Sequence, residues 1–136
     1  FKTYSKNTVE NAQALSASLI ERGYRLVSGG TDNHLMLVDL REKVPDNTGK
    51  EVAVWLENAG MITNHNGIPK DPRPPMQTSG LRLGTPAVTT RGMSKAEMEK
   101  IADWIDQVVV SKGDSSTQER ISKEISNFCA DFPLPH

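Results

Sequence analysis

The feature of the sequence that most constrains the fold is a nearly continuous apolar run, HLMLVDL, at residues 34–40. Turn-forming residues bound the run, and short runs of this kind predict a strand that is buried on both of its faces. A shorter strand is expected just before it, at residues 24–27, closed by the turn SGG at residues 28–30. The chain is therefore expected to contain a sheet.

Helix signals alternate with these strands. Apolar residues recur at helical spacing in residues 8–22, with Thr8 as the expected N-cap and Gly23 as the stop. Three further helices each open with a capping box, in which Ser or Thr is followed three residues later by Glu. These pairs are Thr48 and Glu51, Ser94 and Glu97, and Ser116 and Glu119. The helix at 48 is expected to end at residue 60, and the helix at 94 near residue 110.

The order of these elements indicates the fold class. A short strand is expected at residues 61–63, then an irregular proline-rich segment at 64–80, then a strand around Arg82. This order predicts an α+β fold: a small, mostly antiparallel sheet with helices packed on one face. The length of 136 residues suits a single domain, residues 1–136.

Composition excludes several classes of function. The net charge of −1 and the lack of a Lys/Arg run exclude a nucleic-acid partner, and no apolar run approaches the length of a membrane span. The single cysteine, Cys129, suits a small buried side chain in a reducing, cytoplasmic location. His34, His65 and His136 are too scattered to predict a metal site. The sequence also lacks a phosphate-binding glycine loop and a nucleophile elbow.

Arg82 is the strongest candidate binding residue. It lies between Leu81 and Leu83, so in an extended strand the leucines face one side and the guanidinium the other. Gly80 and Gly84 bracket the strand and allow a ligand or another backbone to come close. A guanidinium with open space beside it can bond both oxygens of a carboxylate. On its own, the pattern also suits an ordinary solvated arginine.

Several motifs, taken together, resemble a known family. Three carry most of the likeness: RGYRLVSGGTDNHL at residues 22–35, VDLR at 38–41 and SGLRLGTPAVTTRG at 79–92. The helix at 48–60, TNHN at 63–66 and DPRPP at 71–75 fit the same template. In order and approximate spacing they closely resemble the C-terminal region of serine hydroxymethyltransferase, and the resemblance covers nearly the whole chain.

The resemblance implies a fold-type I enzyme that uses pyridoxal phosphate to interconvert serine plus tetrahydrofolate and glycine plus 5,10-methylenetetrahydrofolate. It implies that Arg82 binds the substrate carboxylate and so fixes which Cα bond stands perpendicular to the cofactor ring. It also places the segment at 64–66 near the folate, with Asn66 contacting the pterin and His65 beside it, where the family commonly has lysine. For Arg41 and Arg91 we expect a structural ion pair or an interdomain contact.

The resemblance also implies what the chain lacks. In the family, the Schiff-base lysine and most cofactor contacts lie in a preceding large domain, and none of those motifs occurs in residues 1–136. The chain begins at Phe1 without an initiator methionine, so we expect the small C-terminal domain of a longer protein, which alone should be inactive. The intact protein is expected to be a homodimer or homotetramer.

Two alternatives stay open at the level of the sequence. The chain could be the C-terminal domain of a related pyridoxal-phosphate lyase resembling threonine aldolase, although SGGTDNH at residues 28–34 and the proline-rich loop argue against it. It could also be a non-catalytic binding or assembly module derived from the family.

Overall fold

The computed structural model describes residues 2–27, 35–61, 63–84 and 93–131. In chain order, the elements are α1 (Lys2–Glu21), β1 (Arg25–Leu26), β2 (Leu35–Asp39), α2 (Gly49–Asn58), β3 (Asn64–Asn66), β4 (Gly80–Gly84), α4 (Lys95–Val110) and α5 (Ser115–Cys129). The strands form one antiparallel sheet in the order β1-β2-β4-β3. The predicted α+β class is confirmed.

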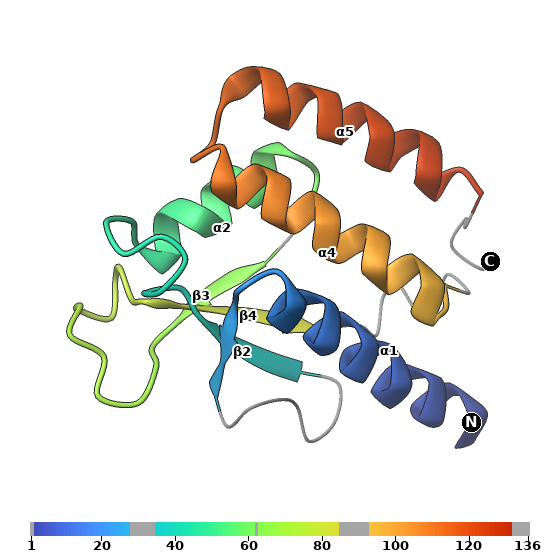
Figure 1. The fold of residues 1–136 in the computed structure, drawn as a ribbon, viewed down its shortest axis with the longest axis horizontal. Coiled ribbons are helices and arrows are strands. Elements are labelled where there is room, and N and C mark those ends of the chain that lie inside the picture. The colour runs from blue at the N-terminus through green and yellow to red at the C-terminus, as the bar shows by residue number, and fades with distance from the viewer. Residues whose placement is uncertain (1, 28–34, 62, 85–92, 132–136) are drawn as a thin grey trace.

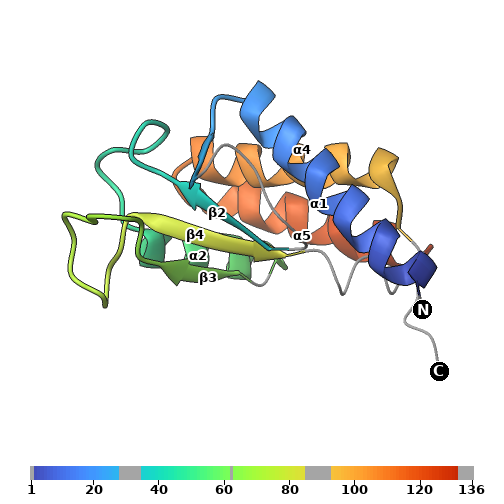
Figure 2. The ribbon, with the colours of Figure 1, turned by 90° about the horizontal axis from the view of Figure 1, so that it is seen from below.

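Helices cover one face of this sheet. In Figure 1 the helices α2, α4 and α5 lie on the upper side of the sheet, and Figure 2 views the sheet from its other side. Burial along β4 agrees, because Leu81 and Leu83 are buried and Arg82 between them is exposed. Met36 and Val38 of β2 are paired with these leucines and are also buried. The opposite face of the sheet is covered by none of the described helices.

The core lies between the covered face and the helices. Helix α1 packs along α4, and α5 packs on α2 and α4. Each helix supplies side chains that are almost fully buried, among them Leu19 of α1, Leu56 of α2, Met98 of α4 and Ile121 of α5. Full burial of a side chain of this size contributes about 1.5–3 kcal/mol. The helical layer therefore holds the sheet from one side and leaves its other side available.

Two of the three predicted capping boxes form. The hydroxyl of Thr48 accepts a hydrogen bond from the Glu51 N–H at 3.1 Å, and the Glu51 carboxylate accepts one from the Thr48 N–H at 2.9 Å. Ser94 and Glu97 form the equivalent box at the start of α4. These bonds satisfy backbone donors that have no partner within the helix, so α2 and α4 begin where the sequence predicts.

Two helix starts differ from prediction. Helix α1 begins at Lys2, so Thr8 lies inside the helix and is not its N-cap. Helix α5 begins at Ser115, and Asp114 takes the capping role that was predicted for Ser116. The Asp114 carboxylate accepts a hydrogen bond from the Thr117 N–H at 3.0 Å. Asp is a stronger N-cap than most residues, and here it begins the helix earlier than the Ser116–Glu119 pattern indicates.

Two strand predictions also need correction. The third strand is Asn64–Asn66, within the segment expected to be irregular, and the two described residues of the strand predicted at 61–63, Met61 and Thr63, lie outside it. It forms because it pairs with residues 80–82 of β4. The strand at 34–40 is not buried on both faces, since Leu37 is partly exposed on the side that the described helices leave uncovered.

Some predictions fall on residues outside the described part of the chain: the turn at 28–30, and the residues His34, Arg91 and His136. Among the described helices, none is both long enough and apolar enough to cross a membrane.

Candidate functional site

Arg82 belongs to a row of residues on the uncovered face of the sheet. It pairs with Leu37 of β2 on one side and with Asn64 of β3 on the other. Directly opposed residues of antiparallel strands point to the same face, with Cβ atoms about 4.5–5.5 Å apart. The guanidinium therefore projects from a position between a partly exposed leucine and an exposed asparagine.

The neighbouring row brings Asn66 to the same face. Asn66 pairs with Gly80, two residues before Arg82, which makes Asn66 a diagonal neighbour of Arg82 at about 7–8 Å. Gly80 leaves no room for a larger residue, because a Cβ there would lie 2.5 Å from the Asn66 carbonyl oxygen and 2.8 Å from the Ile68 Cγ2 atom. The glycine thus lets the chain around Asn66 and Ile68 lie directly against β4.

His65 lies on the opposite face from these residues. It pairs with Leu81, whose side chain is buried beneath the helices, and the His65 Nδ1 atom is buried without a hydrogen-bond partner among the described residues. The structure therefore brings Arg82 and Asn66 together on one face and separates His65 from both. A folate contact by His65 stays a prediction without geometric support.

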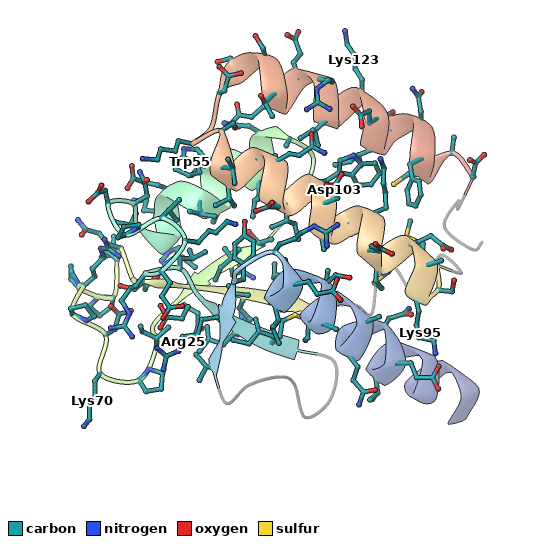
Figure 3. The ribbon with its side chains drawn as sticks, in the orientation of Figure 1. Arg25, Trp55, Lys70, Lys95, Asp103 and Lys123 are labelled. Atoms are coloured by element: carbon teal, nitrogen blue, oxygen red, sulfur yellow. The ribbon has the colours of Figure 1, made fainter. Side chains whose placement is uncertain are left out.

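Arg82 differs from the other arginines near this face in having no partner within the described residues. Arg25 of β1, shown in Figure 3, lies 3.7 Å from a Glu42 oxygen. Arg41 is bonded to Asp39. No ion pair or side-chain hydrogen bond involves the Arg82 guanidinium in the described part of the chain. An exposed guanidinium in this state is available to an anionic ligand.

The partner of Arg41 is a buried carboxylate at the end of β2. The Arg41 Nε and Nη2 atoms donate to the two oxygens of Asp39 at 3.1 and 2.9 Å, and the Arg41 N–H donates at 3.0 Å. These side-chain bonds from Arg41, together with its charge, lower the pKa of the Asp39 carboxyl. The predicted structural ion pair for Arg41 is confirmed, and two of the three guanidinium nitrogens donate to Asp39.

The loop between β3 and β4 is ordered by one carboxylate, that of Asp71. Its Oδ2 atom accepts hydrogen bonds from the Ile68 N–H at 3.2 Å and the Ser79 N–H at 2.7 Å. Its Oδ1 atom accepts from the Arg73 N–H at 2.9 Å and the Ser79 hydroxyl at 2.8 Å. The Arg73 guanidinium donates in turn to the Ser79 Oγ and to the Pro45 carbonyl, at 3.0 and 2.8 Å. We call this set of five residues the Asp71 hub.

The hub stabilises the ionised form of Asp71. Burial acts to raise the pKa of the carboxyl, but the bonds from the Arg73 N–H, the Ser79 hydroxyl and N–H, and the Ile68 N–H outweigh it. The pKa falls from 3.8 to about 2. Because Ile68 follows Asn66 by two residues and Ser79 precedes Arg82 by three, the hub joins the two strand ends that carry the candidate site.

A hollow lies against β1, the end of β2 and the start of the loop between β3 and β4. Its volume is about 670 Å³, and Arg25, Asp39, Arg41, Ile68 and Pro69 are among its lining residues. Neither Arg82 nor Asn66 lines it. The candidate site is thus an open sheet face that needs a second surface to enclose a ligand. No group of three or more potential metal-ligating side chains occurs among the residues that the structure describes.

The roles of three residues in this region were not predicted. Asn64 belongs to the segment expected near the folate, but the sequence does not indicate that it lies directly opposite Arg82. Asp71 belongs to the motif DPRPP, although its role as an acceptor of four hydrogen bonds depends on the folded loop. Asp39 is the only acidic residue in the apolar run at 34–40, and that isolation is a signal that could have identified it as paired.

Comparison of the sequence with known proteins identifies the family to which the chain belongs. The sequence pattern described as "Serine hydroxymethyltransferase" matches residues 1–105. The chain belongs to the serine hydroxymethyltransferase family. It is 49% identical over 135 residues to a serine hydroxymethyltransferase of Sorangium cellulosum (strain So ce56), covering 99% of this chain and 31% of that protein. It is 49% identical over 134 residues to that of Acinetobacter baylyi (strain ATCC 33305 / BD413 / ADP1), covering 98% and 32%.

A third serine hydroxymethyltransferase, from Halorhodospira halophila (strain DSM 244 / SL1), is 48% identical over 134 residues, covering 98% of this chain and 32% of that protein. The chain thus spans about a third of the length of the curated serine hydroxymethyltransferases it matches. Membership of this transferase family decides against the threonine-aldolase alternative.

Proposed function

We propose that this chain is the small C-terminal domain of a serine hydroxymethyltransferase. In the intact protein, we propose, serine and tetrahydrofolate are interconverted with glycine and 5,10-methylenetetrahydrofolate. The observation that carries the residue-level proposal is the exposed, unpartnered guanidinium of Arg82 on the uncovered sheet face, in the same row as Asn64 and diagonal to Asn66. Family membership supports the proposed reaction, and the geometry of the sheet face supports Arg82 as a ligand-binding residue.

The role proposed for Arg82 is to hold the carboxylate of serine. A planar guanidinium can bond both carboxylate oxygens at once, which sets the orientation of the amino acid as well as its affinity. Leu81 and Leu83 are buried beneath the helices, so the backbone that carries Arg82 is fixed on both sides of it. An anchor on a fixed strand orients its ligand with little loss of freedom on binding.

The role proposed for Asn66 is to contact the pterin of tetrahydrofolate. Its amide lies on the same face as Arg82, at the end of a short strand beside the loop of the Asp71 hub. An amide supplies both a donor and an acceptor, which suits a pterin ring. We leave the His65 side chain out of this proposal, because it points to the covered face of the sheet.

The described residues do not by themselves fit a site for pyridoxal phosphate. Helix N-termini are the usual phosphate sites, but the first N–H groups of α2 already donate to the Thr78 and Gln77 carbonyls at 3.0 and 3.1 Å. At the start of α4 the Glu97 N–H donates to the Ser94 carbonyl at 3.1 Å, and at the start of α5 the Thr117 N–H donates to the Asp114 carboxylate at 3.0 Å. Bound pyridoxal phosphate supplies an electron sink for the reaction, and we derive no step through it from this chain.

We therefore propose that the large domain of the intact protein holds the cofactor, that the present chain alone is inactive, and that the intact enzyme is a cytoplasmic homodimer or homotetramer. The second surface that the open sheet face lacks would then come from that domain or from a neighbouring subunit. Substrate and folate would be enclosed only when the parts assemble.

The test is the kinetics of Arg82→Lys in the intact enzyme, with Arg25→Lys as a matched control. Both arginines are exposed and lie on the same sheet face, but Arg25 already has Glu42 as its neighbour. A hydrogen bond to a charged group contributes about 1.5–3 kcal/mol, so kcat/KM for serine should fall about 10- to 150-fold in Arg82→Lys. Arg25→Lys should leave it unchanged. Normal serine kinetics in Arg82→Lys would remove Arg82 from the site.

A further inference from the structure

We propose that Asn66 is a site of spontaneous deamidation, a chemical modification that changes the charge of the uncovered sheet face. Asn66 is followed by Gly67, and this is the only Asn-Gly pair among the eight asparagines of the sequence. Asparagine is thermolabile because the nitrogen of the next peptide can attack its side-chain amide. Glycine in the next position removes the Cβ that hinders this attack and lets the backbone turn toward it.

The local structure leaves the attacking nitrogen available. Asn66 is the last residue of β3, and Gly67 is exposed and lies outside the strand. Within the described part of the chain, the Gly67 N–H makes no backbone hydrogen bond. The atom nearest to a Cβ built on Gly67 is an Asp71 Oδ2 at 4.0 Å, so the residue is not crowded.

The side chain of Asn66 already lies against the residue that would attack it. Its Nδ2 atom donates a hydrogen bond to the Gly67 carbonyl at 2.9 Å. The backbone of Asn66 is paired with Gly80, so the movement needed for ring closure must come from the side chain and from Gly67. Both have the necessary freedom, since the side chain is partly exposed and glycine rotates easily.

The reaction needs only water and base. Base removes the proton of the Gly67 N–H, and the nitrogen attacks the Asn66 side-chain carbon. The new C–N bond closes a five-membered succinimide as the bond to the side-chain nitrogen breaks and ammonia leaves. Water then opens the ring. Cleavage at the side-chain carbonyl gives aspartate, and cleavage at the backbone carbonyl gives isoaspartate, which adds one atom to the main chain.

Asn64 provides an internal comparison on the same strand. It lies two residues earlier, faces the same side of the sheet and is more exposed than Asn66. The residue that follows it is His65, which carries a side chain and is held in the strand opposite Leu81. Exposure alone would favour Asn64, whereas the mechanism proposed here selects Asn66.

Deamidation would place a carboxylate diagonal to Arg82, about 7–8 Å away across the strands. The new charge would attract the guanidinium and compete with any anionic ligand of Arg82. It would also replace an amide donor with an acceptor. This consequence for catalysis rests on the function proposed above, whereas the modification itself does not.

The test begins with the intact protein, incubated at mildly alkaline pH and sampled over time. Trypsin releases residues 51–70 as one peptide, which contains Asn58, Asn64 and Asn66. Fragmentation of this peptide should locate the mass increase at Asn66, with aspartate and isoaspartate both present and the rate rising with pH. An unmodified Asn66 in the folded protein, under conditions in which the free peptide is modified, would overturn the proposal. So would equal modification at Asn64.

Gly67→Ala is the matched control variant. The φ angle of Gly67 is not among the positive values, and a Cβ there meets nothing closer than 4.0 Å, so the variant should fold. The rate at Asn66 should fall by at least about tenfold, because a side chain at the attacking residue restricts ring closure. An unchanged rate would show that the attack by the Gly67 nitrogen is not the route.

Asn66→Asp separates this proposal from the proposed function. If Arg82 holds the serine carboxylate, the variant should show a raised KM for serine in addition to altered use of tetrahydrofolate. Normal kinetics for both substrates, in a protein whose Asn66 is shown to deamidate, would count against the proposed site and leave the modification standing.

Discussion

Replacing Asp71 by asparagine is expected to destabilise the folded chain at neutral pH by removing the charge at the centre of the Asp71 hub. The variant keeps the size of the side chain but loses one of the two acceptor oxygens. The oxygens of Asp71 accept four hydrogen bonds, from the Ile68 and Arg73 N–H groups and from the N–H and hydroxyl of Ser79. An amide cannot accept all four.

The size of the effect follows from the pKa. Folding lowers the pKa of Asp71 from 3.8 to about 2, and each pKa unit corresponds to somewhat more than 1 kcal/mol, so the ionised side chain contributes roughly 2 kcal/mol before solvent screening. Asp71 is only partly buried, which reduces this to about 1–2 kcal/mol. Because the pKa is lower in the folded state, the contribution is complete above pH 3.8 and is lost as the pH falls toward 2.

The assay is urea unfolding of the 136-residue chain at a series of pH values, with Asp46→Asn as the control. Asp46 is an exposed aspartate outside the hub. At pH 7 the urea midpoint of Asp71→Asn should be lower by about 0.5–1 M, for a slope of about 2 kcal/mol per M. Near pH 3 about half of that difference should remain. Equal midpoints at pH 7, or a difference that does not shrink on acidification, would refute the assignment of this stability to the charge.

Two further predictions concern packing. Gly80→Ala should lower the free energy of unfolding by about 1–3 kcal/mol or prevent β3 from pairing, because the new Cβ would lie 2.5 Å from the Asn66 carbonyl oxygen. Gly67→Ala should change the free energy of unfolding little. Similar urea midpoints for the two variants would contradict the close approach at Gly80. Leu56→Ala should lower the free energy of unfolding by about 2–5 kcal/mol, because Leu56 is fully buried. Val54 lies on the same helix but is 46% exposed, so Val54→Ala should change the free energy of unfolding by less than about 0.5 kcal/mol. A larger effect of Val54→Ala than of Leu56→Ala in calorimetric unfolding would place the buried face of α2 elsewhere.

The parts of the fold that could be predicted depend on residues close in sequence. The capping boxes of Thr48 and Ser94 were found because both partners lie within one turn. The start of α5 was missed because Asp114, outside the predicted pattern, accepts a hydrogen bond from the Thr117 N–H and so begins the helix before Ser116. Local signals therefore locate a helix well, but they do not decide between neighbouring caps.

The third strand could not be found in this way. Asparagine has a low β propensity, so Asn64–Asn66 does not resemble a strand by composition. Its extended form comes from pairing with β4, which follows only after the loop of residues 67–79. A strand that forms because it pairs with a distant strand can be identified only when the register between the two strands is known.

In the candidate site, too, the features set by neighbouring residues could be predicted and those set by strand pairing could not. Alternation of Leu81, Arg82 and Leu83 predicts the outward direction of the guanidinium, and the structure confirms it. The neighbours of Arg82 depend on how β2 and β3 align with β4. That alignment places Asn64 and Asn66 on the face of Arg82 and His65 on the other, a separation that three adjacent residues in the sequence do not suggest.

The order of the strands has a consequence for the local dynamics of the proposed site, because Arg82 and Asn66 lie on strands with different numbers of neighbours. Strand β4 lies between β2 and β3, so the backbone around Arg82 is paired on both sides, whereas β3 has only β4 as a neighbour in the described sheet. Amide hydrogens near Arg82 should exchange with solvent more slowly than those of Asn64–Asn66, because an end strand can open without its neighbour. The position that would orient a small amino acid is thus the rigid one. The position that would meet a larger and more variable ligand lies on the strand that can adjust.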